Sequence, residues 1–277
     1  MVSDRELSVA IAGLGAIGLA VARRLDDGHG GGIKGLRLAA VSARDRAGAA
    51  ARMADFAAPV PVLTLAELGG TESDVVVECA PAALFREIAE PAIRAGRIFL
   101  PVSVGALLQH DDLIELAGQR GACIIVPTGA LLGLDAVRAA AEGGIHSVTM
   151  ITAKPPAGLA GAPYLEENGI SLDGLAEPLQ VFSGSAREGA RGFPANVNVA
   201  AALSLAGIGP DQTRLEIWAD PEVTRNTHRI EVEAQAARFS MSIENVPSEE
   251  NPRTGRITPL SVIAALRRLV DLLVAGS

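Results

Sequence analysis

Short apolar runs alternate with segments of helical periodicity through the first half of the chain. The apolar runs lie at residues 7–12, 36–41, 61–63, 74–78, 97–102 and 122–126. The helical segments lie at residues 19–25, 80–95 and 111–120, with a further helix beginning at Arg46. Near-continuous apolar strands that alternate with helices are typical of a parallel sheet covered on both faces. We therefore predict an open, doubly wound α/β domain here.

The second half of the chain follows a different pattern. Its strand-like runs alternate apolar and polar residues, and they lie at residues 147–154, 179–183, 214–218, 228–234 and 238–243. Such alternation is typical of a sheet with one covered face. Together with helices at residues 132–141 and 199–206, these runs predict a second, α+β domain over residues 131–255.

The chain ends in another helical segment, within residues 256–277. Its apolar residues Leu260, Ile263, Leu266, Val270 and Leu273 are expected to share one face. One helix cannot form a domain alone, so we expect it to complete the first domain, residues 1–130.

The sequence Gly13-Leu-Gly15-Ala16-Ile17-Gly18 joins the first strand to the first helix. In this spacing Gly13 allows a tight turn, Gly15 admits a pyrophosphate, and Gly18 lets the helix pack closely on the strand. The helix start, with Ala16 and Ile17, offers N–H groups and a positive dipole end to phosphates. An ordinary glycine-rich turn is the alternative, but a strand before the motif and a helix after it favour a Rossmann-type dinucleotide-binding domain.

Small residues end several of the predicted parallel strands, among them Cys79, Ala80 and Ser103. Ligands of open parallel sheets bind outside the carboxyl ends of the strands, where small side chains leave room. We expect these three residues to contact the cofactor. The alternative is that they are ordinary small residues at which strands end and loops begin.

The end of the second strand bears on the choice of cofactor. An acidic residue at this place binds the adenosine ribose in NAD-dependent enzymes, and the chain has Ala43 there. Ser42 and Arg44 could instead hold the 2′-phosphate of NADP. Asp45 comes one or two residues late for the acidic position, and it could be merely the N-cap of the next helix. We expect either NAD or NADP to serve, with a slight preference for NADP tolerance.

Composition narrows the classes of function. The 277 residues are 49% hydrophobic and 3% aromatic, and the formal net charge of −8 with scattered basic residues argues against nucleic acid or an anionic membrane as partner. Cys79 and Cys123 lack metal-ligand spacing, so we expect two buried free thiols and no metal site. No signal-peptide core and no long apolar run is evident, which favours a cytoplasmic protein.

His228 is the strongest candidate for acid–base chemistry. It shares strand parity with Ile230 and Val232, while Arg229 and Glu231 take the other face. The histidine should therefore lie on the sheltered face. It is either a general acid/base or a hydrogen-bonded core histidine.

Four other polar residues are candidates for substrate or cofactor binding. Asn196 and Asn198 flank the start of a helix, where an N-cap accounts for one of them and a side-chain amide can orient a carboxylate or carboxamide. Lys154 and Arg225 could bind a substrate carboxylate, although Lys154 could equally be a solvated strand end. Ser185 and Glu188 form a capping-box pattern, which is structural.

The chain resembles the L-aspartate dehydrogenases over nearly its whole length. The resemblance is carried by the glycine motif at 13–18 and by Val76-Val-Glu-Cys-Ala80, Ser103-Val-Gly-Ala106, Pro127-Thr-Gly-Ala130, Phe182-Ser-Gly-Ser-Ala-Arg-Glu-Gly189, Phe193-Pro-Ala-Asn-Val-Asn-Val-Ala-Ala201 and Thr224-Arg-Asn-Thr-His228. It implies a catalytic His228, dinucleotide contacts at Ala130 and Asn198, and a homodimer built through the sheet of the second domain.

The resemblance implies oxidative deamination of L-aspartate, through iminoaspartate, to oxaloacetate and ammonia. By the same analogy, iminoaspartate could be a precursor for NAD biosynthesis. Two alternatives stay open. One is another two-domain NAD(P) oxidoreductase, such as a homoserine dehydrogenase-like enzyme, and the other is a non-catalytic NADP-binding regulator.

Overall fold

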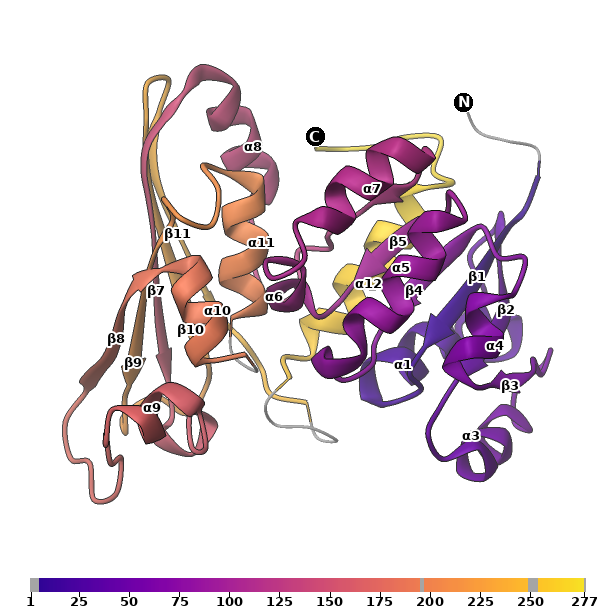
Figure 1. Ribbon diagram of the computed structural model, residues 1–277, viewed down its shortest axis with the longest axis horizontal. Coiled ribbons are helices and arrows are strands. Elements are labelled where there is room, and N and C mark those ends of the chain that lie inside the picture. The colour runs from indigo at the N-terminus through magenta and orange to yellow at the C-terminus, as the bar shows by residue number, and fades with distance from the viewer. Residues whose placement is uncertain (1–4, 195–196, 249–253, 277) are drawn as a thin grey trace. The chain divides into compact units, whose positions relative to one another are not determined.

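Two compact units make up the chain, coloured from indigo to yellow along the sequence in Figure 1. The computed structural model describes residues 5–194, 197–248 and 254–276. The first unit contains Met1–Pro127 and Pro259–Ala275, and the second contains Thr128–Thr258.

The first unit is built on a six-stranded parallel sheet. Its strands are β1 (Leu7–Ala12), β2 (Leu36–Ser42), β3 (Val62–Leu63), β4 (Val75–Glu78), β5 (Ile98–Pro101) and β6 (Cys123–Ile124). Their order is β3-β2-β1-β4-β5-β6, with every neighbouring pair parallel. The order reverses direction between β1 and β4, which is the switch point of a doubly wound fold.

Both faces of this sheet are covered, as the apolar runs predict. One face packs on α1 (Ala16–Leu25), α3 (Arg46–Met53) and α12 (Ile257–Arg268), and the other packs on α4 (Leu65–Gly69), α5 (Phe85–Arg94) and α7 (Asp112–Arg120). Strand β1 shows why: Val9 and Ile11 join the first cluster, whereas Ala10 and Ala12 join the second. Successive side chains point to opposite faces, so a strand buried on both sides must be apolar throughout.

The glycine motif performs the tasks that its spacing predicts for the backbone. Gly13 has a φ of 101°, and a Cβ there would lie 2.6 Å from the carbonyl oxygen of Cys79. At Gly18 a Cβ would lie 1.9 Å from the carbonyl oxygen of Gly13, so only glycine lets α1 approach the turn. At Gly15, by contrast, a Cβ would meet nothing within 4 Å.

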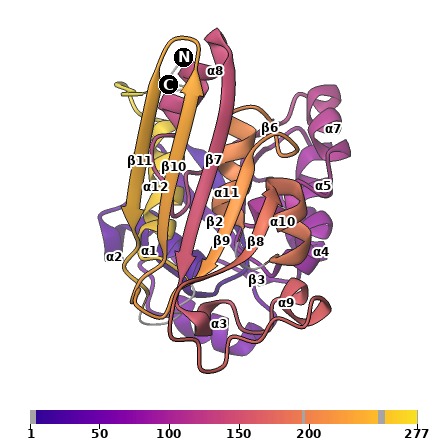
Figure 2. The same ribbon diagram turned by 90° about the vertical axis from the view of Figure 1, so that its left-hand side faces the viewer.

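A five-stranded mixed sheet forms the second unit. Its strands are β7 (Ile145–Lys154), β8 (Leu179–Ser185), β9 (Arg214–Ala219), β10 (Thr227–Ala234) and β11 (Arg238–Glu244), in the order β11-β10-β7-β9-β8. Figure 2 looks onto this sheet, with β7 at its centre. Strand β7 pairs antiparallel with β10 and parallel with β9.

One face of the second sheet is covered by helices of the same unit, in agreement with the alternating pattern. These helices are α8 (Leu134–Gly143), α10 (Ala186–Gly192) and α11 (Asn198–Ala206) (Figures 1 and 2). On β10, His228, Ile230 and Val232 are buried, whereas Arg229 is exposed and Glu231 half-buried. The parity prediction for His228 is therefore confirmed.

Three of the few aromatic residues pack together beside α10. Rings of Tyr164 in α9 (Pro163–Glu167), Phe182 and Phe193 lie with centroids 5.2–5.6 Å apart. A Cβ added at Gly192 would lie only 2.8 Å from the Tyr164 side chain, so the close packing requires glycine there. The cluster fixes the chain that leads from β8 towards α11.

Several predicted details are wrong. The last helix ends at Arg268, before Val270 and Leu273, and Leu260 is 59% exposed while Val262 and Leu266 form the buried face. The short helices α2 (Asp27–Gly30) and α6 (Val104–Leu107), the latter directly after Ser103, are not among the predicted helices. The predicted helical segment 80–95 is divided into the 3-10 turn η1 (Ala82–Leu84) and α5, whereas the 3-10 turn η2 (Pro156–Gly158) and α9 were not predicted.

The expectation of two buried thiols also fails. Cys123 is exposed and Cys79 is half-buried, and neither forms a disulfide. The two-residue strand β6 lies at the edge of its sheet, so it is less sheltered than its apolar sequence predicts.

Substituting Gly18 with alanine tests the close approach of α1 to its turn. We expect Gly18→Ala to lower the free energy of unfolding by about 3 kcal/mol, because the added Cβ forces the helix away from the Gly13 carbonyl. The matched control is Gly118→Ala in α7, where a Cβ meets nothing and alanine should add up to about 1 kcal/mol. Urea unfolding followed by circular dichroism measures both, and equal effects would contradict the packing argument.

Candidate functional site

The carboxyl edge of the first sheet brings together most of the residues predicted to bind a cofactor. Gly13 follows β1 and donates its backbone N–H to the carbonyl of Ser42, the last residue of β2, at 3.1 Å. Cys79 and Ala80 follow β4, and Ser103 follows β5. Segments that are distant in the sequence thus meet where ligands of open parallel sheets bind.

A buried carboxylate holds this edge together. Glu78, the last residue of β4, is fully buried and accepts hydrogen bonds at both oxygens. One oxygen receives the N–H of Ala80 at 3.0 Å and the hydroxyl of Ser103 at 3.1 Å. The other receives the N–H groups of Val102 at 3.2 Å and Ser103 at 2.9 Å. Glu78 therefore fixes the loops after β4 and β5 relative to each other.

Burial governs the protonation of both acidic groups at this edge. It raises the pKa of the Glu78 carboxyl, although the hydrogen bonds from Ser103, Ala80 and Val102 act in the opposite direction. Burial, together with the neighbouring Glu78, raises the pKa of the Cys79 thiol well above its usual range. Cys79 is consequently a neutral thiol at neutral pH and lacks the thiolate that nucleophilic chemistry requires.

The start of α1 fits a dinucleotide pyrophosphate. Its first intrahelical hydrogen bond runs from Leu19 N–H to the Gly15 carbonyl, so the N–H groups of Ala16, Ile17 and Gly18 precede that bond. The first turn contains no acidic side chain, and the space at Gly15 is open. Free N–H donors, the helix dipole and an unobstructed approach are what a phosphate needs at a helix N-terminus.

The structure at the end of β2 shows the role of Asp45, which the sequence left open. Asp45 is the N-cap of α3, and its side chain accepts the N–H of Gly48 at 3.0 Å. Ser42 is 1% exposed and its hydroxyl has no hydrogen-bond partner, whereas Arg44 is exposed. The acidic residue here caps a helix.

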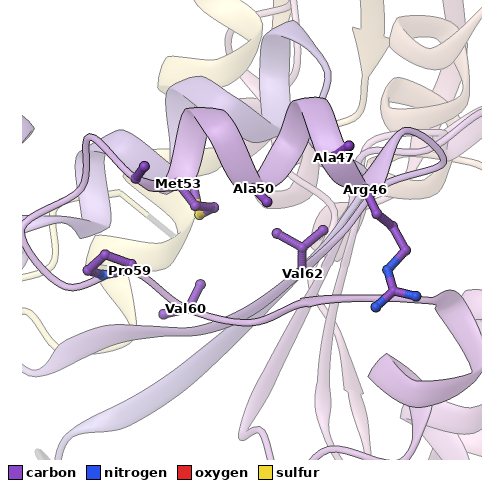
Figure 3. Close-up of a pocket in the computed structure, with 8 residues that line it drawn as sticks. Arg46, Ala47, Ala50, Met53, Pro59, Val60 and Val62 are labelled. Carbon is purple, nitrogen blue, oxygen red and sulfur yellow. The ribbon is translucent and has the colours of Figure 1, made fainter.

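A groove of about 520 Å³ lies between α3 and the segment leading into β3 (Figure 3). Its lining is apolar apart from Arg46, and includes Met53, Pro59, Val60 and Val62. None of the residues predicted for cofactor, substrate or catalysis lines this groove. It lacks the groups that acid–base chemistry requires.

The second unit places three polar side chains on the covered face of its sheet. Thr152 and Lys154 of β7 are 2% and 5% exposed, and His228 of β10 is 3% exposed. His228 lies directly opposite Thr152 in the β7–β10 ladder, and Lys154 is two residues further along the same face. Thr152 Oγ1 and His228 Nδ1 form a hydrogen bond of 2.8 Å.

Burial shifts both titratable groups towards their neutral forms. The pKa of Lys154 falls to about 8, because burial removes water from the ammonium group. The pKa of His228 falls to about 3, first because of burial and second because of the nearby Lys154 charge. His228 is therefore a neutral imidazole at neutral pH, and the interpretation of Lys154 as a solvated strand end is wrong.

The remaining predicted residues occupy different surroundings. Asn198 is the first residue of α11 and half-buried; the N-cap is Val197, so Asn198 does not have the capping role. The carbonyl of Ala130 accepts a hydrogen bond from Asn245 Nδ2 at 3.0 Å.

Arg225 is exposed in the loop before β10, apart from the buried face, and Asn196 lies outside the described residues. His146 is exposed, and His110 stacks on Phe85.

Two polar residues of these sites were not singled out from the sequence. Thr152 shares strand parity with Val148, Met150 and Lys154, so the rule that placed His228 on the covered face would also have found it. Glu78 ends a strand that is otherwise valine, and an acidic residue there resembles an ordinary strand end. Only the three-dimensional neighbours of Glu78 reveal its role.

A parallel sheet with a dinucleotide-type glycine turn, joined to a second unit with a buried histidine and lysine, defines a class of protein. That class is the two-domain NAD(P)-dependent dehydrogenases. Within the described residues, no group of three or more His, Cys, Asp or Glu side chains is suited to a metal ion. In the same part of the chain, no helix is long and apolar enough to cross a membrane.

Comparisons with known proteins narrow the class. The family profile "Aspartate dehydrogenase, C-terminal" matches residues 135–269, and the profile "Homoserine dehydrogenase, NAD binding domain" matches residues 13–127. An L-aspartate dehydrogenase of Bradyrhizobium diazoefficiens is 57% identical over 99% of this chain and 96% of its own. The L-aspartate dehydrogenase 3 of Bordetella bronchiseptica is also 57% identical, over 97% of each chain.

A solved structure supports the fold independently. The crystal structure of aspartate dehydrogenase from Thermotoga maritima matches with a TM-score of 0.71 and 21% identity, over 98% of this chain and 99% of that one. The chain belongs to the L-aspartate dehydrogenase family. The family and fold expected from the sequence are confirmed.

Replacing Glu78 with glutamine tests its role at the sheet edge. We expect Glu78→Gln to lower the free energy of unfolding by about 2 kcal/mol. Both carboxylate oxygens of Glu78 accept hydrogen bonds, and in glutamine one of them is replaced by an NH2 group, which cannot accept from these donors. We also expect weaker NAD(P) binding, measured by calorimetry. Glu87→Gln, at an exposed position of α5, is the matched control. Wild-type stability in Glu78→Gln would show that the carboxylate does not hold the loops.

Proposed function

We propose that this chain catalyses the NAD(P)-dependent oxidation of L-aspartate, through iminoaspartate, to oxaloacetate and ammonia. The near full-length identity of 57% to proteins named L-aspartate dehydrogenase supports this activity. The structural observation that carries it is the burial of His228 and Lys154 together on the covered face of the second sheet. A substrate such as aspartate is anionic and must lose a proton. It therefore requires a cationic group to bind it and a neutral imidazole to accept the proton.

His228 serves as the proton acceptor in this proposal. Its imidazole is neutral at neutral pH and held in a fixed place by the β7–β10 ladder, so it can accept a proton from the substrate ammonium or from the attacking water. An anionic substrate next to Lys154 offsets the charge that disfavours imidazolium, which raises the basicity of His228 when substrate is present.

Lys154 is the strongest candidate to bind a substrate carboxylate. Its ammonium group is buried on the same face as His228, so an ion pair with a carboxylate there is weakly screened by water. Arg225 is exposed in the loop before β10, and Asn196 remains a candidate from the sequence alone. The second carboxylate of aspartate requires one of these or a backbone donor.

The cofactor is expected at the carboxyl edge of the first sheet. When bound, NAD(P)⁺ accepts a hydride from Cα of aspartate, and one water and the release of one proton complete the balance to oxaloacetate and ammonium. Gly13, Gly15 and the α1 N-terminus are proposed to hold the pyrophosphate, with Cys79, Ala80 and Ser103 beside it. Ala130 and Asn198 are proposed dinucleotide contacts from the family resemblance.

The preference between NAD and NADP depends on the end of β2. Arg44 is exposed, and the carboxylate of the adjacent Asp45 is engaged in capping α3. Ser42 is buried, which makes Arg44 the better candidate of the two. We propose that both cofactors are accepted.

A homodimer formed through the second sheet is also proposed. Figure 2 shows the face of this sheet that no helix of the described residues covers. Ile151, Ala153 and Trp218 lie on it, half-buried, and the indole Nε1 of Trp218 has no hydrogen-bond partner. These apolar side chains lie beside charged ones, with Arg229 directly opposite Ile151 in the ladder, and a mixture of apolar and charged residues occurs at subunit interfaces. A cytoplasmic location remains a prediction.

Competing activities are less well supported. The homoserine dehydrogenase profile matches only residues 13–127, which hold the cofactor edge and not His228 or Lys154. The aspartate dehydrogenase profile matches residues 135–269, where both lie. A non-catalytic regulator would have no need for a histidine and a lysine buried on one apolar face.

Reduction of NAD⁺ and NADP⁺ by the purified protein, followed by absorbance over a panel of amino acids and hydroxy acids, tests the proposal. We expect turnover with L-aspartate, and the reverse reaction with oxaloacetate, ammonia and reduced cofactor. The ratio of kcat/KM for the two cofactors, in the wild type and in Arg44→Ala, measures the contribution of Arg44. Cofactor binding without turnover of aspartate or oxaloacetate would refute the activity.

Removing the imidazole tests the role of His228 in the same assay. We expect His228→Gln to lower kcat for aspartate about a hundredfold or more, which is the usual contribution of a positioned acid–base group. His146→Gln, at an exposed position of β7, should leave kcat unchanged. A folded His228→Gln variant with wild-type kcat would show that another group takes the proton.

A further inference from the structure

The contact between Thr152 and His228 determines which nitrogen of the histidine is available. Thr152 Oγ1 lies 2.8 Å from His228 Nδ1, and both residues are at least 97% buried. On the other side of β10, the residue opposite His228 is Ile243, which offers no polar group. From the two flanking strands, the Thr152 hydroxyl is therefore the hydrogen-bond partner of the imidazole, and it engages Nδ1.

We propose that Thr152 is a positioning residue that holds Nδ1 of His228 and leaves Nε2 as the nitrogen that exchanges a proton with the substrate. The proposal rests on the function proposed above and names a further residue for it. Thr152 itself does not touch the reacting atoms.

A hydroxyl partner differs from a carboxylate partner in a way that matters for this reaction. A hydroxyl can donate or accept, so it satisfies Nδ1 whether or not that nitrogen carries a proton. When Nδ1–H donates to Oγ1, Nε2 has a free lone pair and can accept a proton. When the imidazole is charged, Oγ1 still accepts from Nδ1–H. When the hydroxyl donates to Nδ1, Nε2–H can donate. Deamination and its reversal require both directions of proton transfer at one site.

The ladder explains why the contact is maintained. Thr152 and His228 are directly opposed residues of antiparallel strands, so their side chains leave the sheet on the same face and at close range. Thr152 is β-branched, which restricts its χ1 and keeps the hydroxyl aimed at the ring. The charged group that faces this pair from β7 is Lys154, and it favours the neutral imidazole.

Two substitutions at Thr152 separate the hydroxyl from the shape of the side chain. Thr152→Val keeps the β-branched volume and removes the hydrogen bond, whereas Thr152→Ser keeps the hydroxyl. We expect Thr152→Val to lower kcat for aspartate at least tenfold with KM changed less than threefold, and Thr152→Ser to recover most of kcat. Thr71→Val, which removes a hydroxyl that donates to the Leu68 carbonyl in the first unit, is the matched control and should leave both constants unchanged.

Nuclear magnetic resonance of ¹⁵N-histidine in the whole protein gives a readout that does not depend on turnover. The His228 ring signals are assigned by their loss in His228→Gln. We expect the Nδ1 resonance to shift in Thr152→Val and to stay near its wild-type position in Thr152→Ser and Thr71→Val. Thermal unfolding verifies that each variant is folded.

The outcomes distinguish this proposal from the activity on which it rests. An unchanged Nδ1 resonance in folded Thr152→Val, or an unchanged kcat, would overturn the positioning role. Absence of aspartate turnover in the wild type would overturn the proposed function, and the Nδ1 resonance would still decide whether Thr152 holds the ring. A rise in KM with kcat unchanged in Thr152→Val would also overturn the proposal, since it would indicate a role in substrate binding.

Discussion

Burial of a lysine and a histidine on one apolar sheet face is the constraint on which the second unit depends. Charged groups lose hydration when buried, and the pKa values of Lys154 and His228, about 8 and 3, show how strongly that loss disfavours their charged forms. Strands β7, β9 and β10, which are described in full, place no acidic side chain on this face. We propose that an anionic substrate binds at this face, because an adjacent anion offsets the cost of burying the Lys154 charge.

The first unit differs from the second, because backbone groups and not charged side chains form its proposed cofactor site. Gly13 and Gly18 bring strand, turn and helix so close that any side chain would collide, and Gly15 leaves the approach to the helix N-terminus open. Glu78 then ties the loops after β4 and β5 with four hydrogen bonds. In the proposed function, backbone donors beside the first sheet hold the cofactor, whereas buried side chains of the second sheet bind the substrate.

The sequence predicts those features that depend on local pattern. Alternation placed His228 on the covered face, the glycine spacing located the turn before α1, and Ser185 with Glu188 forms the expected capping box. Features set by distant neighbours were missed: Thr152 meets His228 across 76 residues of sequence, and Glu78 looks like an ordinary strand end until its partners are known. The last helix is shorter than its sequence predicts, because apolar residues after Arg268 continue the helical periodicity beyond the end of the helix.

Proton uptake on binding of a dicarboxylate measures the central claim most directly, namely that the buried face of the second unit receives an anion. Succinate carries both carboxylates of aspartate but no amine to oxidise, and it is titrated calorimetrically into the holoenzyme at pH 8 in buffers of different ionisation enthalpy. Lys154, with a pKa near 8, is partly neutral at that pH, and an adjacent anion raises its pKa. We predict net proton uptake in the wild type and its loss in Lys154→Met. A binding enthalpy that is independent of the buffer would contradict the account.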